Sequence, residues 1–307
     1  MDVVSDAISA VRIGRPSSNR VRVDGTWCAR FAPYEGAGFH VVMEGSCWLL
    51  PDGGTPITLG AGDAVLLPHG AGHVIADSAA DAATVAQAVP FERWADAGQS
   101  RRPPGASREV EMLCGKYRLD RSRAHPLMQE LPEVVHLPNR VGVNLELRSA
   151  IDLLGRELDG RRPGACIAVP SLLDLLLVYM IRSWLTEGAA GGAPAGAWPA
   201  VLGDPVTAAA LRALHSDPAA PWTNDLLAAE AGVSRPTLAR RFGTLVGRSP
   251  MAYLTWWRLT YAAALLRDTP DSLATIAGRV GYGTPYALSH AFNREFGTTP
   301  GRYRTGR

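Results

Sequence analysis

Ser234-Arg-Pro-Thr-Leu-Ala-Arg-Arg-Phe242 is repeated fifty residues later as Thr284-Pro-Tyr-Ala-Leu-Ser-His-Ala-Phe292. The match continues downstream, where Gly247, Ser249-Pro250 and Tyr253 correspond to Gly297, Thr299-Pro300 and Tyr303. Upstream of each copy, small and apolar residues end on a glycine, Gly232 or Gly281. Each copy therefore predicts a helix, a glycine turn and a second helix, which Ser234 or Thr284 caps.

This pattern meets the packing needs of a helix-turn-helix unit. Leu238 and Phe242 lie four residues apart, as do Leu288 and Phe292, so each pair is predicted to hold its second helix against a core. The opposite face is then free to enter the major groove of DNA. Between the two copies, Met251 to Arg267 predicts one long helix, with apolar positions at Leu254, Trp257, Tyr261 and Leu265.

Charge is distributed unevenly along the 307 residues. Residues 222–307 contain 11 arginines, no lysine and 5 acidic residues, which gives +6, whereas the first 221 residues carry −4. A basic C-terminal segment indicates a polyanionic partner at that end of the chain. The alternative at this stage is a solvated basic surface without a partner.

The C-terminal segment, over about residues 205 to 305, resembles the AraC/XylS family of bacterial regulators. The most specific part is Ile276-Ala-x-x-Val280-Gly281-Tyr282 followed by Phe292-x-x-x-Phe296-Gly-x-Thr-Pro300-x-x-Tyr303-Arg304. The resemblance implies a transcription regulator that reads double-stranded promoter DNA with two helix-turn-helix units, at about 223–246 and 272–296. RNA polymerase is a further partner that it leaves open.

The resemblance places the DNA contacts on the two capped helices. Arg240 is expected to read a base, since a guanidinium pairs bidentately with guanine, whereas Thr244, Arg248 and Arg294 are expected to hold phosphates. The remaining expected contacts are Ser234, Arg235, Pro236 and Ala239 in the first unit, and Thr284, Pro285, Tyr286, Ser289 and His290 in the second.

The first half of the chain has a different character. Short β-type runs separated by turns predict a small barrel or sandwich; they are Trp27–Phe31, Phe39–Met43, Cys47–Leu50, Ala64–Leu67, His73–Ala76 and Glu111–Leu119. A helical period follows from Leu147 to Leu158, and Ser171 is expected to cap a second helix that ends near Leu185. The fold class is thus α+β, with a sensor and dimerisation domain over 1–187, a linker over 188–202 and a DNA-binding domain over 203–307.

Two stretches of the early strands resemble the motifs of cupin domains. Gly62-Asp-x-x-x-x-Pro68-x-Gly70-x-x-His73 resembles the second motif, and Gly38-x-His40-x-x-x-Glu44 resembles the first, with Gly38 where a metal-binding histidine normally lies. The resemblance offers His40, Glu44 and His73 as ligands of a divalent metal. The other interpretation is a metal-free pocket for a small-molecule effector, lined by Trp27, Phe39, His40, Trp48 and His73.

Three classes of function remain open at this point. The leading interpretation is an effector-responsive, homodimeric regulator in the cytoplasm, because no secretory leader, membrane span or cysteine framework is recognisable. The second is a cupin metalloenzyme with an attached DNA-binding domain, and the third is an architectural DNA-binding protein without a sensor. A redox-sensing role of Cys28, Cys47 and Cys114 is a variant of the first. The effector, the target genes and the sign of regulation are not predicted.

Overall fold

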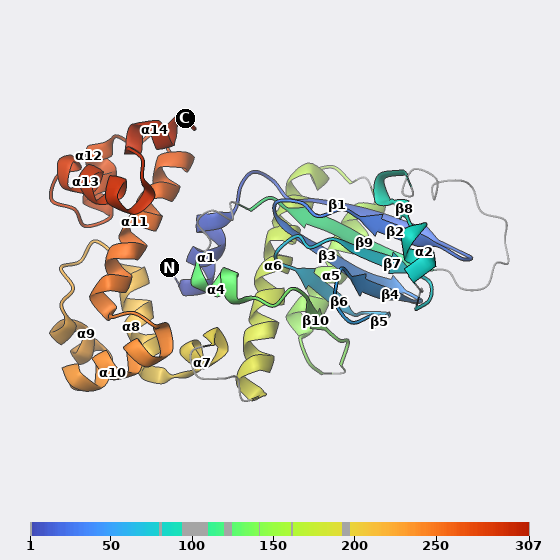
Figure 1. Ribbon diagram of the computed structural model, residues 1–307, viewed down its shortest axis with the longest axis horizontal. Coiled ribbons are helices and arrows are strands. Elements are labelled where there is room, and N and C mark those ends of the chain that lie inside the picture. Colours follow the sequence, from blue (N-terminus) through green and yellow to red (C-terminus); the bar gives the residue numbers. More distant parts are fainter. Residues whose placement is uncertain are drawn as a thin grey trace. The chain divides into compact units, whose positions relative to one another are not determined.

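A computed structural model describes residues 2–79, 82–93, 110–119, 125–140, 142–160, 162–191 and 197–306. The chain divides into two compact units, each built from separate segments. The sheet unit comprises Arg12–Ser122 and Leu131–Trp184. The helical unit comprises Met1–Val11, Arg123–Glu130 and Leu185–Arg307, so a short N-terminal segment and an internal segment belong to it (Figure 1).

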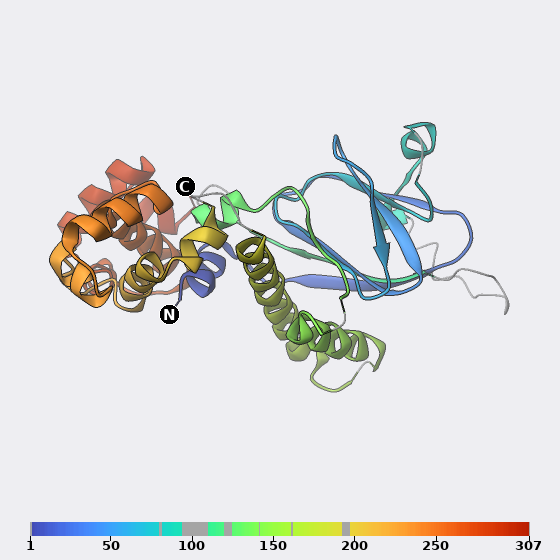
Figure 2. The same ribbon diagram turned by 90° about the horizontal axis from the view of Figure 1, so that it is seen from below.

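The sheet unit is a sandwich of two five-stranded sheets, which face one another in Figure 2. The first has the order β1 (Ser17–Val23), β9 (Val110–Tyr117), β3 (Ala37–Glu44), β6 (Ala64–Leu67) and β10 (Val135–Leu137). The second has the order β5 (Ile57–Gly60), β4 (Ser46–Pro51), β7 (His73–Ala76), β2 (Cys28–Phe31) and β8 (Val89–Pro90). Buried residues of both sheets, such as Val42, Met112, Leu49 and Ile75, form one core between them.

All six predicted strand runs coincide with observed strands. The prediction missed β1, β5, β8 and β10. Of these, β1 pairs antiparallel with β9 over its whole length, from Ser17 opposite Lys116 to Val23 opposite Val110. Its sequence, Ser-Ser-Asn-Arg-Val-Arg-Val, has few apolar residues, because one face of this edge strand is exposed. Pairing with β9, rather than local sequence, determines this strand.

Two helices complete the sheet unit, together with the short α2 (Ala82–Ala86). The tyrosine hydroxyl of Tyr117 on β9 donates to the carbonyl of Leu173 in α6 (Ala165–Ala190), at 2.7 Å. The guanidinium of Arg20 on β1 donates to the carbonyl of Gly155 in α5 (Leu145–Gly160), at 3.1 Å. Both helices therefore pack on the sheet that contains β1 and β9.

The prediction that Ser171 caps the second of these helices is wrong. Helix α6 begins six residues earlier and includes Pro170, and the Ser171 hydroxyl donates to the carbonyl of Ile167 one turn before it, at 2.9 Å. Helix α6 is also long and apolar enough to cross a membrane by length and composition alone. It carries Asp174, which forms an ion pair with Arg12 at 2.5 Å, and core side chains such as Leu176 and Leu177.

The helical unit contains the predicted tandem repeat. Its elements are α1 (Val3–Val11), α4 (Pro126–Glu130), α7 (Trp198–Gly203), α8 (Pro205–Ser216), α9 (Asn224–Glu230), α10 (Arg235–Val246), α11 (Pro250–Asp268), α12 (Leu273–Arg279), α13 (Pro285–Phe296) and α14 (Pro300–Arg304). Helix α11 connects the unit α9–α10 to the unit α12–α13 (Figure 1). The expected helix over Met251–Arg267 is thereby confirmed.

The segment expected to be a linker has more helix than predicted. Helix α6 continues to Ala190 and α7 begins at Trp198, a residue with 3% of its surface exposed. The part between them, residues 192–196, lies outside the described residues. The backbone N–H of Trp198 donates to the carboxylate of Glu130 at 2.7 Å, so the first residue of α7 is hydrogen-bonded to the last residue of α4.

Candidate DNA-reading surface and sensor cavity

Local sequence positions the first capped helix, α10. The turn after α9 holds Gly232 at φ +66°, a left-handed conformation that glycine adopts without steric cost. The Ser234 hydroxyl then accepts a hydrogen bond from the backbone N–H of Thr237 and caps α10. Leu238 and Phe242 are fully buried, and the Phe242 ring meets the Tyr253 ring of α11 edge to face, with centroids 5.7 Å apart. The predicted inward pair is confirmed.

The second capped helix, α13, is held in the same way. Gly281 has φ +78°, and a Cβ atom there would lie 2.8 Å from the Arg258 guanidinium, so this turn needs glycine twice over. The Thr284 hydroxyl accepts from the backbone N–H of Ala287. Leu288 and Phe292 are fully buried. The two copies thus share one construction.

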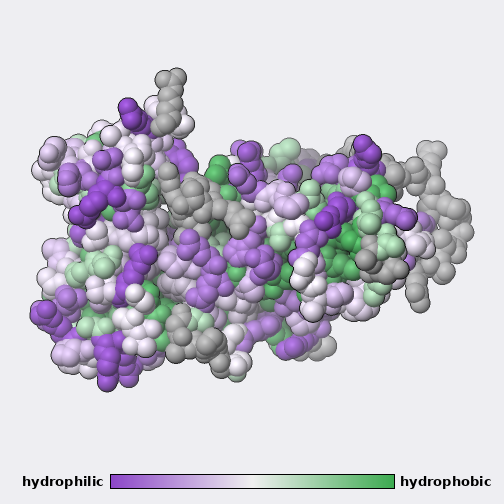
Figure 3. All heavy atoms as spheres, in the orientation of Figure 1, coloured by the Kyte–Doolittle hydropathy of each residue, from purple (hydrophilic) through white to green (hydrophobic). Residues whose placement is uncertain are grey.

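The faces opposite these buried pairs are open to solvent. Arg235, Pro236, Ala239 and Arg240 are exposed on α10, as are Thr244 and Arg248 near its end. On α13, Pro285, Tyr286, His290 and Arg294 are exposed and Ser289 is half-buried; Ser234 and Thr284 are exposed at the caps. Figure 3 shows hydrophilic side chains spread over the helical unit. Nearly all the residues predicted to contact DNA are therefore accessible.

These exposed side chains differ in how they are held. Arg235 lies 3.7 Å from Asp225 in a solvated ion pair, and the Arg248 guanidinium lies over the Trp256 ring at 5.6 Å. Arg240 has no ion pair among the described residues. Tyr286 exposes 81% of its surface, the largest value among the exposed apolar residues. Arg240 and Tyr286 are thus both available to a partner.

The sheet unit contains a cavity of about 420 Å³, within the range of small-molecule sites. Aromatic and small side chains make up much of its wall, and among the described residues Lys116 and Glu92 are the charged side chains in it. Its lining consists of Ser17, Ser18, Asn19, Phe31, Ala32, Pro33, Tyr34, Gly38, His40, His73, Phe91, Glu92, Cys114, Gly115 and Lys116.

Two buried histidines meet in the wall of this cavity. The Nε2 atoms of His40 and His73 are 2.8 Å apart, and His73 Nδ1 lies 2.9 Å from the carbonyl oxygen of Ala71. Burial lowers the pKa of His40 well below its usual range and that of His73 to about 4, so both rings are neutral near pH 7. The carbonyl can only accept, so His73 carries its proton on Nδ1, and His40 donates from Nε2. His40 Nδ1 is then a bare acceptor, and it has no hydrogen-bond partner among the described residues.

The residues around these histidines do not fit a divalent metal. Gly38 offers no ligand, and a Cβ atom there would lie 3.1 Å from the Tyr34 hydroxyl, which takes up the adjacent space. Glu44 is exposed at the far end of β3, beyond a bulge between Val42 and Glu44, whereas His40 is buried. No group of three or more potential ligands occurs among the described residues. The structure brings together His40 and His73 alone from the predicted ligand set.

The aromatic residues predicted to line a pocket lie elsewhere. Trp27 belongs to the core between the sheets, and the buried Phe39 ring packs on Tyr117 with centroids 5.6 Å apart. Trp48 is half-buried on β4. Instead, Phe31 lies between the two histidines and Phe91, parallel to His73 at a centroid distance of 4.7 Å and to Phe91 at 4.4 Å. Phe31 and Phe91 lie outside the two cupin-like motifs, so the sequence did not indicate that they line the cavity.

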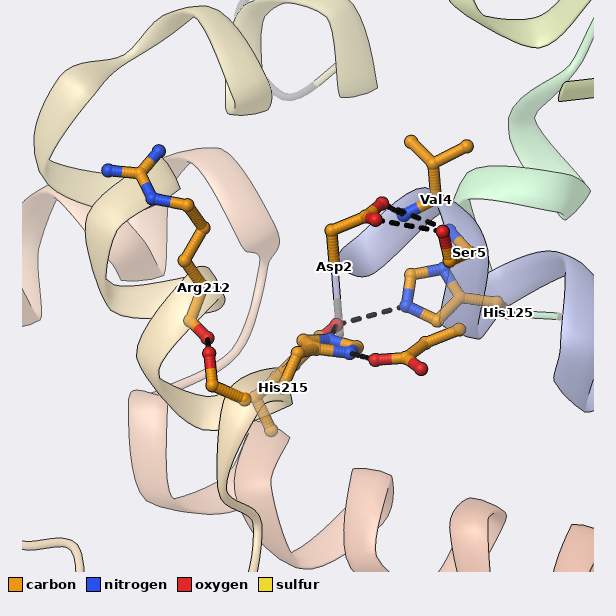
Figure 4. A network of polar contacts seen from close by, with 9 residues as sticks. Asp2, Val4, Ser5, His125, Arg212 and His215 are labelled. Atoms are coloured by element: carbon orange, nitrogen blue, oxygen red, sulfur yellow. Dashed lines mark hydrogen bonds and ion pairs between the residues drawn. The ribbon is translucent and has the colours of Figure 1, made fainter.

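Sequence reasoning also missed a buried polar cluster in the helical unit. Asp6, His125, His215 and Tyr253 expose at most 2% of their surfaces and come from four separate segments. The Tyr253 hydroxyl lies 2.9 Å from His125 Nε2 and 2.8 Å from His215 Nε2, and His215 Nδ1 lies 2.7 Å from Asp6. Figure 4 shows His125 and His215 approaching one point from different elements. Hydrogen-bonded partners in the cluster are up to 209 residues apart in sequence, so no local pattern revealed it.

Comparisons with known proteins agree with both units. A cupin family model matches residues 2–186, and a helix-turn-helix domain model matches residues 227–306. An AraC-like transcription regulator of Streptomyces lividans is 36% identical over 305 residues, covering 99% of this chain and 98% of its own. The regulator AlkR of Acinetobacter baylyi is 26% identical, covering 99% of both chains. The solved DNA-binding domain of AdpA, in complex with a target DNA, is 35% identical over 34% of this chain and 92% of its own, with a TM-score of 0.32.

A cupin sandwich joined to two capped helix-turn-helix units defines a two-domain, DNA-binding transcription regulator. The chain belongs to the family of AraC-like transcription regulators with an N-terminal cupin domain. The expectations of fold class and of DNA-binding function are confirmed.

Proposed function

We propose that this regulator responds to a small organic molecule bound in the cavity of the sheet unit. The observation that carries the proposal is the cavity itself, about 420 Å³ in volume and walled by Phe31, Phe91, Tyr34 and the paired histidines. The chemistry of these residues suits an organic ligand and not a metal. The cupin metalloenzyme therefore receives no support from the residues present, and we propose a sensor without catalysis.

The walls also indicate the chemistry of the effector. Within the part of the chain that the structure describes, the neutral imidazoles leave His40 Nδ1 as an unpartnered acceptor, and the hydroxyls of Tyr34 and Ser18 have no partner either. A buried polar atom without a partner costs about 1–3 kcal/mol, so a ligand that satisfies one of these atoms gains affinity. The favoured effector is an uncharged molecule with an aromatic portion and at least one hydroxyl or N–H donor.

In the helical unit, we propose that α10 and α13 enter successive major-groove segments of promoter DNA, about 34 Å apart. Arg240 reads a base, because its guanidinium is exposed and unpaired by acids among the described residues. Thr244, Arg248 and Arg294 hold phosphates, and the second helix contributes Tyr286, Ser289 and His290. Recruitment of RNA polymerase would follow from binding beside a promoter.

We further propose that the chain acts as a cytoplasmic homodimer through α5 and α6, with no membrane partner. Support comes from large apolar side chains that remain exposed there, namely Leu145, Leu153, Ile167 and Leu175, with Ile167 76% exposed. Residues 1–187 would then sense and dimerise, 188–202 would connect, and 203–307 would bind DNA, with residues 1–11 and 123–130 packing as parts of the helical unit.

The test selects DNA sites with the full chain and then measures affinity for one site with and without two probes. 4-Methylphenol has the required donor, whereas 4-methylanisole has the same ring and no donor. We expect 4-methylphenol to change the DNA dissociation constant at least fivefold and 4-methylanisole to have little effect. Equal responses to both, or binding of neither in a thermal-shift assay, would contradict the proposed effector chemistry. A chain that selects no DNA sequence would favour the architectural alternative.

A further inference from the structure

The buried cluster in the helical unit has a defined hydrogen-bond direction. The backbone N–H of Leu127 donates to His125 Nδ1 at 3.1 Å, so this neutral ring carries its proton on Nε2 and donates to the Tyr253 oxygen. The Tyr253 proton then has one acceptor within reach, His215 Nε2. His215 in turn donates from Nδ1 to Asp6. Each donor has an acceptor along this relay, which runs from Leu127 to Asp6.

The relay holds two segments that are distant in sequence, α1 and the start of α4, against α8 and α11, the helices that flank the first helix-turn-helix unit (α9–α10). Asp6 lies in α1, whose residues Val3, Ala7 and Val11 are also buried, and His125 directly precedes α4. Tyr253 lies on α11 and touches Phe242 of the reading helix α10. The guanidinium of Arg267 on α11 also donates to the carbonyl of Ala10, near the end of α1. Helix α1 is therefore held on α8 near its middle, at Asp6, and on α11 near its C-terminal end, at Ala10.

The same two segments are close in sequence to two strands that line the sensor cavity, although residues 120–124, between β9 and His125, lie outside the described residues. Helix α1 ends at Val11, six residues before Ser17, where β1 begins; His125 follows β9, which ends at Tyr117. Ser17 and Lys116 are paired residues of β1 and β9, and both line the cavity. The pairing extends past the strands through a bridge between Arg12 and Leu119. The end of the β1–β9 pair at Ser17 and Lys116 thus forms part of the cavity wall. In sequence, β1 follows α1 and β9 precedes His125, and both α1 and His125 take part in the relay.

We propose that the Leu127–His125–Tyr253–His215–Asp6 relay couples the β1–β9 wall of the sensor cavity to the position of reading helix α10. This inference rests on the proposed sensing function, because it assigns how that cavity acts on DNA binding. The relay supports DNA binding and does not block it, since Arg235, Pro236, Ala239 and Arg240 stay exposed while α1 is docked. In this proposal, a change in the spacing of β1 and β9 displaces α1 and His125. Because both are hydrogen-bonded through the relay to Tyr253, the displacement also moves Tyr253.

A double-mutant cycle on the full chain tests this coupling without a ligand. Gly115→Ala changes the cavity wall, because its Cβ would lie 2.3 Å from the Phe39 ring and 2.7 Å from the Ser17 carbonyl. Asp6→Ala breaks the relay, and Asp6→Asn keeps an acceptor oxygen for His215. Gly60→Ala on β5 is the control, since its nearest neighbour is the Asp63 carboxylate at 3.9 Å. The readout is the dissociation constant for one selected DNA site.

We expect Gly115→Ala to change this constant at least fivefold, the lower end of typical allosteric coupling. In the Asp6→Ala background the change should fall below twofold, and in the Asp6→Asn background it should return. Gly60→Ala should have no effect in any background. Should Gly115→Ala fail to fold, Gly38→Ala takes its place, since its Cβ meets the Tyr34 hydroxyl at 3.1 Å.

Equal effects of the wall substitution with and without Asp6, or no effect of either wall substitution in a folded chain, would overturn the coupling. Neither outcome depends on the probes used for the effector. A failed response to 4-methylphenol together with an intact cycle would refute the proposed effector chemistry and leave the relay standing.

Discussion

Replacing Tyr253 with phenylalanine should destabilise the helical unit by roughly 2–6 kcal/mol. The substitution keeps the ring that packs on Phe242 and removes one hydroxyl that serves two buried histidines. The His125 Nε2–H then has no acceptor and His215 Nε2 has no donor, and each such buried group costs about 1–3 kcal/mol. Both histidines expose 2% or less of their surfaces, so water does not replace the lost partner without rearrangement.

Urea unfolding of the full chain provides the measurement. Tryptophan fluorescence reports on this unit, because the Trp256 ring lies 5.4 Å from the Tyr253 ring and Trp257 lies beside His215. Tyr261→Phe is the matched control on the same helix, since its ring stacks on Trp257 and its hydroxyl takes no part in the relay. A loss below about 0.5 kcal/mol for Tyr253→Phe, or an equal loss for Tyr261→Phe, would refute the assigned hydrogen bonds.

Three further predictions concern the sheet unit. The full chain should sediment as a dimer at tens of micromolar because of the apolar side chains exposed on α5 and α6, and a strict monomer would argue against that interface. Protein purified without added metal should contain well below one divalent ion per chain. Gly38 offers no ligand and Glu44 is exposed, so only His40 and His73 of the predicted ligand set remain to bind a metal. One tightly held ion per chain by elemental analysis would reverse this conclusion. Stability should also fall as the pH drops from about 6.5 towards 4, because burial lowers the pKa of His73 to about 4 and the unfolded chain binds the proton first. By pH 5 this histidine alone accounts for a loss of about 2 kcal/mol, and an unchanged urea midpoint between pH 7.5 and pH 5 would contradict it.

The sequence predicted those features that local chemistry determines. The caps Ser234 and Thr284, the turns at Gly232 and Gly281, and the inward phenylalanines recur at one spacing, so their roles followed from the repeat. Short β-type runs between turn signals predicted strands such as β6 and β7, which are buried along their whole length. His40 and His73 came together as the cupin resemblance implied, although as a hydrogen-bonded pair.

Features that depend on distant pairing were not predictable in this way. Strand β1 is defined by its partner β9, and helix α1 packs on α8 and α11, which lie more than 190 residues away in sequence. Ser171 preceded an apolar run and followed a proline, so it matched a helix start. The helix nevertheless begins at Ala165, and Pro170 lies inside its first two turns. The cavity walls come from β1, β2, β3, β7 and β9 and from Phe91, which no single stretch of sequence identifies.

DNA reading by the capped helix α10 is tested most directly by affinity measured on a selected site and on a scrambled duplex, across a salt series. Arg240→Ala should weaken binding to the selected site by about 1–3 kcal/mol and relax the preference at one base pair. Arg294→Ala is the matched control, which should weaken both duplexes alike and reduce the salt slope by about one. His290→Ala should fall between them, because a neutral imidazole makes one hydrogen bond and releases little counterion. An equal loss on both duplexes for Arg240→Ala would contradict the assignment of α10 as the sequence-reading helix.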